Sequence, residues 1–345
     1  MQAASAKGLP GLWGAYRLRW KRRRFLFRIW RKRKQIEPVR VRTTGLASDA
    51  ILAFVTVRNE MVRLPYFLQH YRALGVDHFL FVDNDSDDGT ADYLAAQADV
   101  SIWTTKHSYR LARFGVDWLG WLQFKHGHNR WCLTVDADEL LVYPSYQTRD
   151  LKSLTGWLDN QGLPSFGALM LDLYPKGPLE DARYAPGDDP IRTLCWYDAD
   201  NYRHRYHPYY GNLWIQGGVR DRVFFSTEPD RAPTLNKTPL VRWSRRYAYV
   251  SATHQILPRH LHDVFDPEED SKATGVLLHT KFLPLVGAKS AEEMTRKQHF
   301  ENTNLYVHYH QKLTENPTFW YEGSSSYEGC DKLVAQGLMS KGTWV

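Results

Sequence analysis

Cysteine is scarce in this sequence, with three residues in a chain of 345. Cys132, Cys195 and Cys330 are an odd number and do not have the spacing of a metal site. This pattern argues against a disulfide framework and against a cysteine-ligated metal. We therefore expect free thiols in a reducing compartment, which predicts a cytoplasmic protein.

Long apolar runs are missing from the amino-terminal segment. No uninterrupted run in residues 1–36 approaches the roughly 18–20 apolar residues that a membrane span needs. The apolar core of a signal peptide is missing as well. We expect this segment neither to cross a membrane nor to be a cleaved leader.

Acidic residues are also absent from residues 1–36, which contain twelve lysines and arginines. The whole chain has 45 basic and 38 acidic residues, so the remainder has 33 basic residues against all 38 acids, a net charge of −5. A nucleic-acid-binding domain has its basic footprint on the fold itself. The mildly acidic body therefore predicts that nucleic acid is not a partner.

Aromatic residues recur at helical spacing inside the basic segment. Trp13, Trp20 and Phe27 repeat every seven residues, and Tyr16 and Trp30 follow Trp13 and Phe27 by three. A helix with this pattern has aromatic rings along one side and suits an anionic bilayer surface, such as the inner face of a membrane. A disordered basic arm is the alternative that the same composition allows. We expect residues 1–45 to form this basic tail, and residues 46–345 to form a single domain.

Short apolar strands alternate with helical segments in the first part of the domain. Apolar residues make up 43% of the chain, which is a folded composition. The strands that we expect are 51–57, 78–82, 101–105 and 133–136, and the helices are 63–74, 91–98 and 114–126. Such alternation predicts an α/β fold with a doubly wound, mostly parallel sheet. The stretch from Leu163 to Phe282 has no such alternation, and we expect an irregular α+β half there.

The run that ends in Asp136-Ala137-Asp138 has the pattern of a buried strand that places carboxylates at the edge of the sheet. Two hard oxygen ligands at such an edge suit Mg²⁺ or Mn²⁺ with a bound phosphate group. The alternative for an isolated pair of acids is that they cap the next turn.

Two more polar clusters follow expected strands. Arg58-Asn59-Glu60 comes after the first strand, and the residues from Asp83 to Asp88 come after the second. Since parallel strands end at the same edge, a single ligand is expected to contact all three clusters. An EF-hand loop is excluded, because its sixth and twelfth positions require Gly and Glu and are Asp88 and Leu94 here.

Three motifs together resemble a known family. They are Thr56-x-Arg58-Asn59-Glu60, Val82-Asp83-Asn84-Asp85-Ser86-x-Asp88-Gly89-Thr90 and Val135-Asp136-Ala137-Asp138-Glu139. Over roughly Ile51 to Tyr143 the chain is similar to the nucleotide-sugar half of family-2-like glycosyltransferases, which have the GT-A fold. Later elements resemble a small bacterial branch with a His-x-Lys-Phe motif: Leu171-Asp172-x-Tyr174-Pro175, Gly217-Gly218-x-Arg220, Thr253-His254 and His279-x-Lys281-Phe282.

The resemblance implies a division into residues 51–145 for the nucleotide sugar, 146–285 for the acceptor and 286–345 as a helical extension. By the same resemblance, the base and ribose of a nucleoside diphosphate sugar are held by four residues: Arg58, Glu60, Asp83 and Asp85.

The metal residues follow from the same resemblance. Asp136 and Asp138 are expected to hold Mn²⁺ or Mg²⁺ on the diphosphate, and His279 to be the third ligand. The alternative for His279 is a buried core histidine. Lys281 and Lys237 are candidates for phosphate contact, with a solvated lysine as the alternative.

The catalytic base is less sharply indicated. Asp172, Asp221 and His254 all remain candidates for deprotonating an acceptor hydroxyl. We favour Asp221, although its neighbours Arg220 and Arg222 are expected to lower its pKa and weaken it as a base.

The function implied is that of a metal-dependent glycosyltransferase of the hexosyltransferase type, acting in polysaccharide biosynthesis. It moves a sugar, with inversion, from a nucleoside diphosphate sugar to a saccharide or glycoconjugate acceptor. A nucleotidyltransferase is one alternative, but it needs a glycine-rich phosphate loop that Arg58-Asn59-Glu60-Met61 lacks. A non-catalytic carbohydrate-binding protein is the other.

Overall fold

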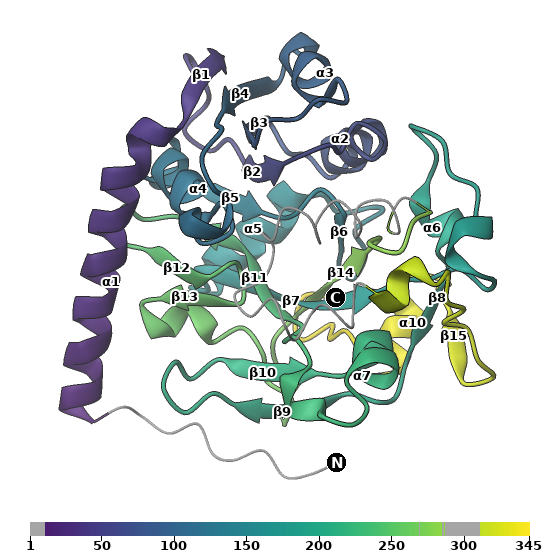
Figure 1. Ribbon diagram of the computed structural model, residues 1–345. Helices are drawn as coiled ribbons and strands as arrows, with labels where there is room; N and C mark the ends of the chain where they lie inside the picture. Colours follow the sequence, from purple (N-terminus) through teal and green to yellow (C-terminus); the bar gives the residue numbers. More distant parts are fainter. Residues whose placement is uncertain (1–10, 269, 285, 287–310) are drawn as a thin grey trace.

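The computed structural model describes residues 11–345 except 269, 285 and 287–310, and it is built around one large sheet (Figure 1). In spatial order the strands of this sheet are β1 (Glu37–Arg40), β4 (Val100–Thr104), β3 (His78–Asp83), β2 (Leu52–Val57), β5 (Trp131–Thr134), β11 (Asn236–Arg242), β7 (Ser165–Asp172), β14 (Gly275–His279) and β6 (Glu139–Val142). Strands β2, β3, β4, β5, β7 and β14 run in one direction, and β1, β11 and β6 run in the other. The predicted α/β class with a mostly parallel sheet is confirmed.

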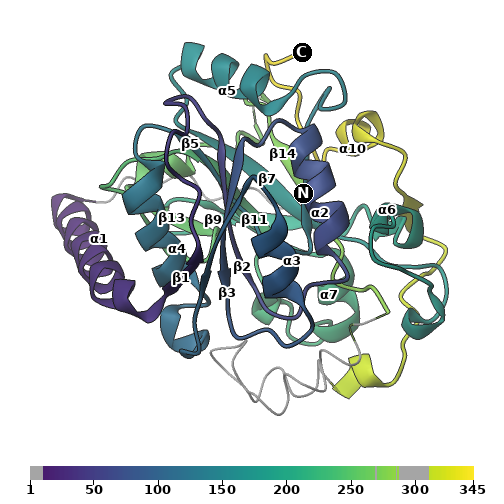
Figure 2. The same ribbon diagram turned by 90° about the horizontal axis from the view of Figure 1, so that it is seen from above.

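Helices cover both faces of the sheet, as Figure 2 shows from above. One face packs against α2 (Leu64–Ala73), α3 (Thr90–Ala96) and α5 (Leu151–Asn160), and the other against α4 (Val116–Leu122). Side chains alternate along a strand, so Val55 of β2 enters the first core and Phe54 the second. This two-sided burial explains why the strand is a continuous apolar run in the sequence.

The basic amino-terminal segment forms a helix that packs on the domain. In α1 (Leu12–Lys32), Leu18 and Ile29 are buried, and α1 lies along α4 (Figure 1). A Cβ atom at Gly120 of α4 would lie 2.8 Å from Cδ1 of Ile29, so glycine permits the close approach. Arg28 Nε also lies 2.6 Å from Asp117 Oδ2 of α4, and Asp117 is fully buried.

Residues 12–40 are therefore packed on the domain, because α1 contacts α4 and β1 pairs with β4 as the edge strand of the sheet. The sequence analysis considered only the aromatic side of the helix. The opposite side of the helix contributes the buried Leu18 and Ile29, and its Arg28 forms an ion pair with Asp117 of α4. The sequence allowed either a helix or a disordered basic arm here, and the structure shows a helix.

The second half of the chain contributes to the same sheet. Strands β7, β11 and β14 come from the stretch where the sequence predicted an irregular half, and β11 is inserted between β5 and β7. Strands β7 and β11 pair with partners far away in the chain, so no local alternation of strands and helices predicts them.

Smaller elements surround the sheet. The two-stranded pairs are β8 (Trp196–Asp198) with β15 (Ser324–Ser326), β9 (Arg203–Tyr206) with β10 (Leu213–Gln216), and β12 (Ala248–Ser251) with β13 (Gln255–Leu257). The short α-helices are α6 (Pro190–Thr193), α7 (Gly218–Phe224) and α10 (Cys330–Ala335). Single turns of 3₁₀-helix are Arg33–Gln35, Arg110–Ala112, Leu179–Asp181, Pro229–Arg231 and Arg259–His262, and a π-helical turn, Gln123–Gly127, extends α4.

Three further expectations concern the C-terminal extension, the cysteines and membrane spans. Of the expected helical extension over residues 286–345, residues 287–310 lie outside the described residues. All three cysteines are described and are free thiols. Among the helices that the structure describes, none combines the length and the apolar character needed to traverse a bilayer.

Candidate active site

Charged residues from five strands meet at one edge of the sheet. Asp172 ends β7 and lies beside His279, which ends the parallel strand β14. His279 also lies opposite Glu139, which begins the antiparallel strand β6. Asp136 follows β5, and Lys237 is the second residue of the antiparallel strand β11. The antiparallel strands thus add their first residues to the edge where the parallel strands end.

His279 bridges two carboxylates at this edge. Its Nε2 lies 3.2 Å from Asp138 Oδ2, and its Nδ1 lies 2.5 Å from Asp172 Oδ1. Arg220 Nε donates to the other oxygen of Asp172 at 2.7 Å. Burial lowers the pKa of His279, but Asp138 and Asp172 outweigh it and raise this pKa to about 9. Without a bound cation the imidazole is therefore protonated at neutral pH.

Asp138 has several positive neighbours. Burial raises its pKa, but the charges of His279, Arg63 and Lys281 lower the pKa well below its usual value. Arg63 is buried, contacts Glu60 Oε2 through Nη1 at 2.8 Å, and donates at 3.4 Å to the carbonyl oxygens of residues 280 and 281. Sequence reasoning missed Arg63, which begins a helix and has no motif around it.

Lys237 neutralises the other acidic residues of the edge. Its Nζ lies 3.2 Å from Asp136 Oδ2 and also donates to Glu139 Oε1. Burial lowers the pKa of Lys237, but Asp136 and Glu139 raise it more, so the ammonium stays charged. The side chain is only 3% exposed, so Lys237 is not a solvated lysine, while the Asp136 side chain is 54% exposed. The structure thus directs Lys237 to two carboxylates.

The loops after β2 and β3 are joined by hydrogen bonds. Arg58 Nη1 donates to the carbonyl oxygen of Asn84 at 2.7 Å and to that of Asp85. Asp83 is buried and accepts from the backbone N–H of Ser86 at 3.2 Å and from its hydroxyl. Burial is also the main reason that the pKa of Asp83 is raised. The Asp85 side chain is half exposed, and its carboxylate lies 4.0 Å from Arg58.

Of the three candidate bases, Asp172 is held by His279 and Arg220, and the other two have different partners. Asp221 accepts two hydrogen bonds from Arg203, at 2.8 and 3.0 Å. His254 Nδ1 lies 2.8 Å from the carbonyl oxygen of Asn236, which makes Nδ1 the protonated nitrogen. Burial, followed by the charge of Lys237, lowers the pKa of His254 to about 3. The lowered pKa makes His254 a weak base at neutral pH.

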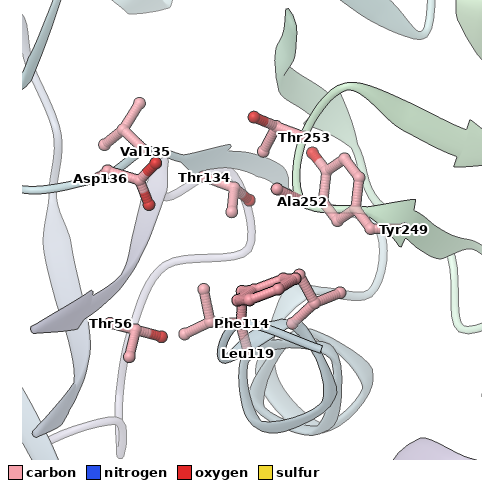
Figure 3. Close-up of a pocket in the computed structure, with 10 residues that line it drawn as sticks. Thr56, Phe114, Leu119, Thr134, Val135, Asp136, Tyr249, Ala252 and Thr253 are labelled. Carbon is pink, nitrogen blue, oxygen red and sulfur yellow. The ribbon is translucent and has the colours of Figure 1, made fainter. Parts of the chain in front are cut away.

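A pocket opens beside Asp136 between the sheet edge, α4 and the turn from β12 to β13 (Figure 3). Its walls are largely apolar and include Phe114, Leu119 and Tyr249. The hydroxyl oxygens of Thr56 and Thr253 line it and are buried without a hydrogen-bond partner in the described part of the chain.

The edge includes donor atoms of the kinds that divalent cations bind. Asp138 offers an oxygen and His279 a nitrogen from two elements, and Asp136 exposes its carboxylate nearby in the chain. The other ring nitrogen of His279 contacts Asp172, which is the support that metal-bound histidines commonly have. Among the described residues, no three acidic, histidine or cysteine side chains already converge on one point.

Comparison with known proteins gives little further guidance. No protein-family model matches the chain, and no curated protein sequence matches it. One similar solved structure is a 4-diphosphocytidyl-2C-methyl-D-erythritol synthase, with 16% identity over 42% of this chain and 67% of that one, and a TM-score of 0.25. Another is a putative glucose-1-phosphate thymidylyltransferase from Bacillus anthracis in complex with a sucrose, with 9% identity over 76% of this chain and 84% of that one, and a TM-score of 0.28. TM-scores this low support no argument about function.

Proposed function

We propose that this protein is a metal-dependent glycosyltransferase that moves a sugar from a nucleoside diphosphate sugar to a hydroxyl group of a saccharide or glycoconjugate. The observation that carries the proposal is the cluster of Asp138, His279 and Asp172 at the edge where the parallel strands end. In open α/β sheets this edge is the usual place for a ligand.

The chain has residues to hold a cation and to balance charge. Asp136, Asp138 and His279 would hold Mn²⁺ or Mg²⁺, which would offset the negative charge that develops on the leaving diphosphate. Asp172 fixes the orientation of the His279 ring. Lys281, which contributes positive charge near Asp138, is the candidate for contact with the diphosphate.

The nucleoside half of the donor is assigned to the joined loops after β2 and β3. Arg58 holds the second loop through two backbone carbonyl oxygens, and Asp83 orders it through Ser86. An exposed carboxylate such as that of Asp85 suits the hydroxyl groups of a ribose. Glu60, held by Arg63, completes the set that the family resemblance implies.

Asp221 and His254 remain the two candidates for the base. Replacement of each by the neutral or non-basic amides, Asp221→Asn and His254→Gln, separates them by the loss of turnover.

Product identity tests the proposal. The protein is incubated with Mn²⁺, a panel of nucleoside diphosphate sugars and, in parallel, nucleoside triphosphates with sugar phosphates. We expect release of a nucleoside diphosphate, abolished by Asp138→Asn and kept by the control Asp230→Asn, whose side chain is exposed. Release of pyrophosphate instead would identify a nucleotidyltransferase, and sugar binding without any release would identify a carbohydrate-binding protein.

A further inference from the structure

The outer face of α1 is aromatic. Trp13, Tyr16, Trp20, Phe27 and Trp30 are each at least half exposed, with Trp13 at 70%. At 3.6 residues per turn, their spacings of three, four, seven and three place them on one side of the helix. The opposite side is the one that packs on the domain. These five side chains are called the aromatic stripe.

The rings of the stripe form two groups, and the rings within each group are in contact. Trp13 stacks on Tyr16 with ring centroids 5.6 Å apart, and Trp20 meets Tyr16 at 6.2 Å. Phe27 stacks on Trp30 at 5.9 Å. Exposed apolar residues scattered singly need no explanation, but a contiguous patch marks an interaction surface.

Arginines border the stripe on both sides. Arg17, Arg24 and Arg31 are exposed along one border and Arg19 along the other, and Arg23 lies between Tyr16 and Trp30 around the helix. The helix contains no acidic residue. Apolar rings in the middle with cations at the flanks are typical of a helix that lies in the plane of a membrane interface.

We propose that the aromatic stripe of α1 docks on a lipid bilayer that contains anionic phospholipids. Trp and Tyr side chains favour the level of the lipid headgroups, and the flanking arginines match the negative surface charge. The docking does not depend on the glycosyltransferase activity.

The charge distribution disfavours two other partners. A second copy of this chain would bring arginines of one acid-free helix against those of another, which is unfavourable. A nucleic acid requires cations along the contact itself, whereas here the centre of the surface is apolar and the body beyond residue 36 is net negative.

The helix is firmly attached, so docking would orient the whole domain. Leu18 and Ile29 are buried, and Arg28 and Arg113 both hold the buried carboxylate of Asp117. In addition, Lys21 donates to the hydroxyl group of Tyr210. The aromatic stripe is therefore a fixed surface of the domain and is not a flexible tether.

The test uses the full chain and sedimentation with phosphatidylcholine vesicles, with or without phosphatidylglycerol. We expect binding that requires phosphatidylglycerol and weakens as salt rises. The triple variant Trp13→Gln, Trp20→Gln, Phe27→Gln should lose binding without a change in thermal unfolding, since these rings are exposed. The control variant Val39→Gln, Val41→Gln, Leu111→Gln replaces exposed apolar residues off the helix and should bind like the wild type.

A second pair of variants tests the charges. Arg24→Gln with Arg31→Gln should weaken binding by roughly 30-fold, because each basic residue near an anionic surface contributes about 1 kcal/mol. The control Arg183→Gln with Arg192→Gln removes two exposed arginines elsewhere and should have no effect. Equal binding to vesicles without phosphatidylglycerol would overturn the proposal. So would wild-type binding by the triple variant, or dimerisation or oligonucleotide binding through the stripe with no vesicle binding.

Discussion

His279 is the central residue of the proposed metal site, and its neighbours fix the orientation of its ring. Asp172 contacts its Nδ1 and is itself held by Arg220, so the ring has little freedom to turn. Replacing His279 directly is an ambiguous test, because it would also leave Asp138 and Asp172 buried without their shared partner. Asp172 is the better residue to change.

We predict that Asp172→Asn weakens Mn²⁺ affinity by about 10–100-fold, which is the usual cost of disturbing a support for a metal ligand. Isothermal titration calorimetry measures this. The matched control is Asp198→Asn, since Asp198 is also a buried aspartate held by an arginine, Arg222. If both variants lose thermal stability but neither loses Mn²⁺ affinity, Asp172 has only a structural role.

Lys237 supports a second prediction, which concerns stability. Lys237→Met should lower the free energy of unfolding by about 3–5 kcal/mol, because it leaves Glu139 buried without its counter-charge. Chemical denaturation gives the value. The double variant Lys237→Met with Glu139→Gln should recover much of the loss. A Lys237→Met protein as stable as the wild type would contradict the ion pair.

A third prediction concerns His70, which packs behind the site. Its Nε2 lies 2.9 Å from the carbonyl oxygen of Leu141, and burial lowers the pKa of His70 to about 4. A lowered pKa means that the unfolded chain takes up a proton first, so this stability is full above pH ~6.5 and declines towards pH ~4. His70→Gln should reduce the decline by up to roughly 3 kcal/mol. Chemical denaturation at several pH values measures this. If the free energy of unfolding fell equally in the wild type and in His70→Gln between pH ~6.5 and pH ~4, the prediction would be wrong.

Single residues were predictable where a motif marks them. Asp138 and His279 were predicted from short patterns, and the structure brings them to 3.2 Å. Arg63 and the Lys237–Glu139 pair were not predicted. The Lys237–Glu139 pair depends on the register of antiparallel strands, and Arg63 depends on the position of α2 beside the residues that follow β14. Neither feature can be recognised in the local sequence.

At the scale of elements, local patterns predicted the early strands and helices well. Residues 51–57, 78–82 and 101–105 are strands within one or two residues, because their apolar runs reflect burial on both faces. The late strands β7 and β11 were missed although they lie in the centre of the sheet. Their pairing is set by residues far away in the chain, and they do not alternate with helices in the sequence.

Helix α1 provides the prediction at this scale. Asp117 is the buried link between α1 and α4, since it accepts from Arg28 and Arg113. Asp117→Asn should loosen α1 while leaving the sheet intact. Hydrogen exchange measured by mass spectrometry should therefore rise in residues 12–32 and stay unchanged in β2 and β3. Unchanged exchange in α1 would show that apolar contacts alone hold the helix.

At the scale of the whole molecule, the domain combines two surfaces. One is the sheet edge where charges from both halves of the chain meet, and the other is the outer face of α1. Because α1 contacts α4 and β12, whose residues line the pocket, the two surfaces belong to neighbouring parts of the fold. Attachment to a bilayer would thus hold the proposed active site in a fixed relation to the membrane.

The central claim is that the sheet edge binds a nucleoside diphosphate through a divalent cation. Isothermal titration calorimetry with uridine and guanosine diphosphates, with Mn²⁺ or with a chelator, measures this directly. We predict binding only with Mn²⁺, lost in Asp136→Asn and Asp138→Asn and kept in the exposed control Asp230→Asn. Nucleotide affinity that is the same with the chelator, or that survives in both site variants, would contradict the account.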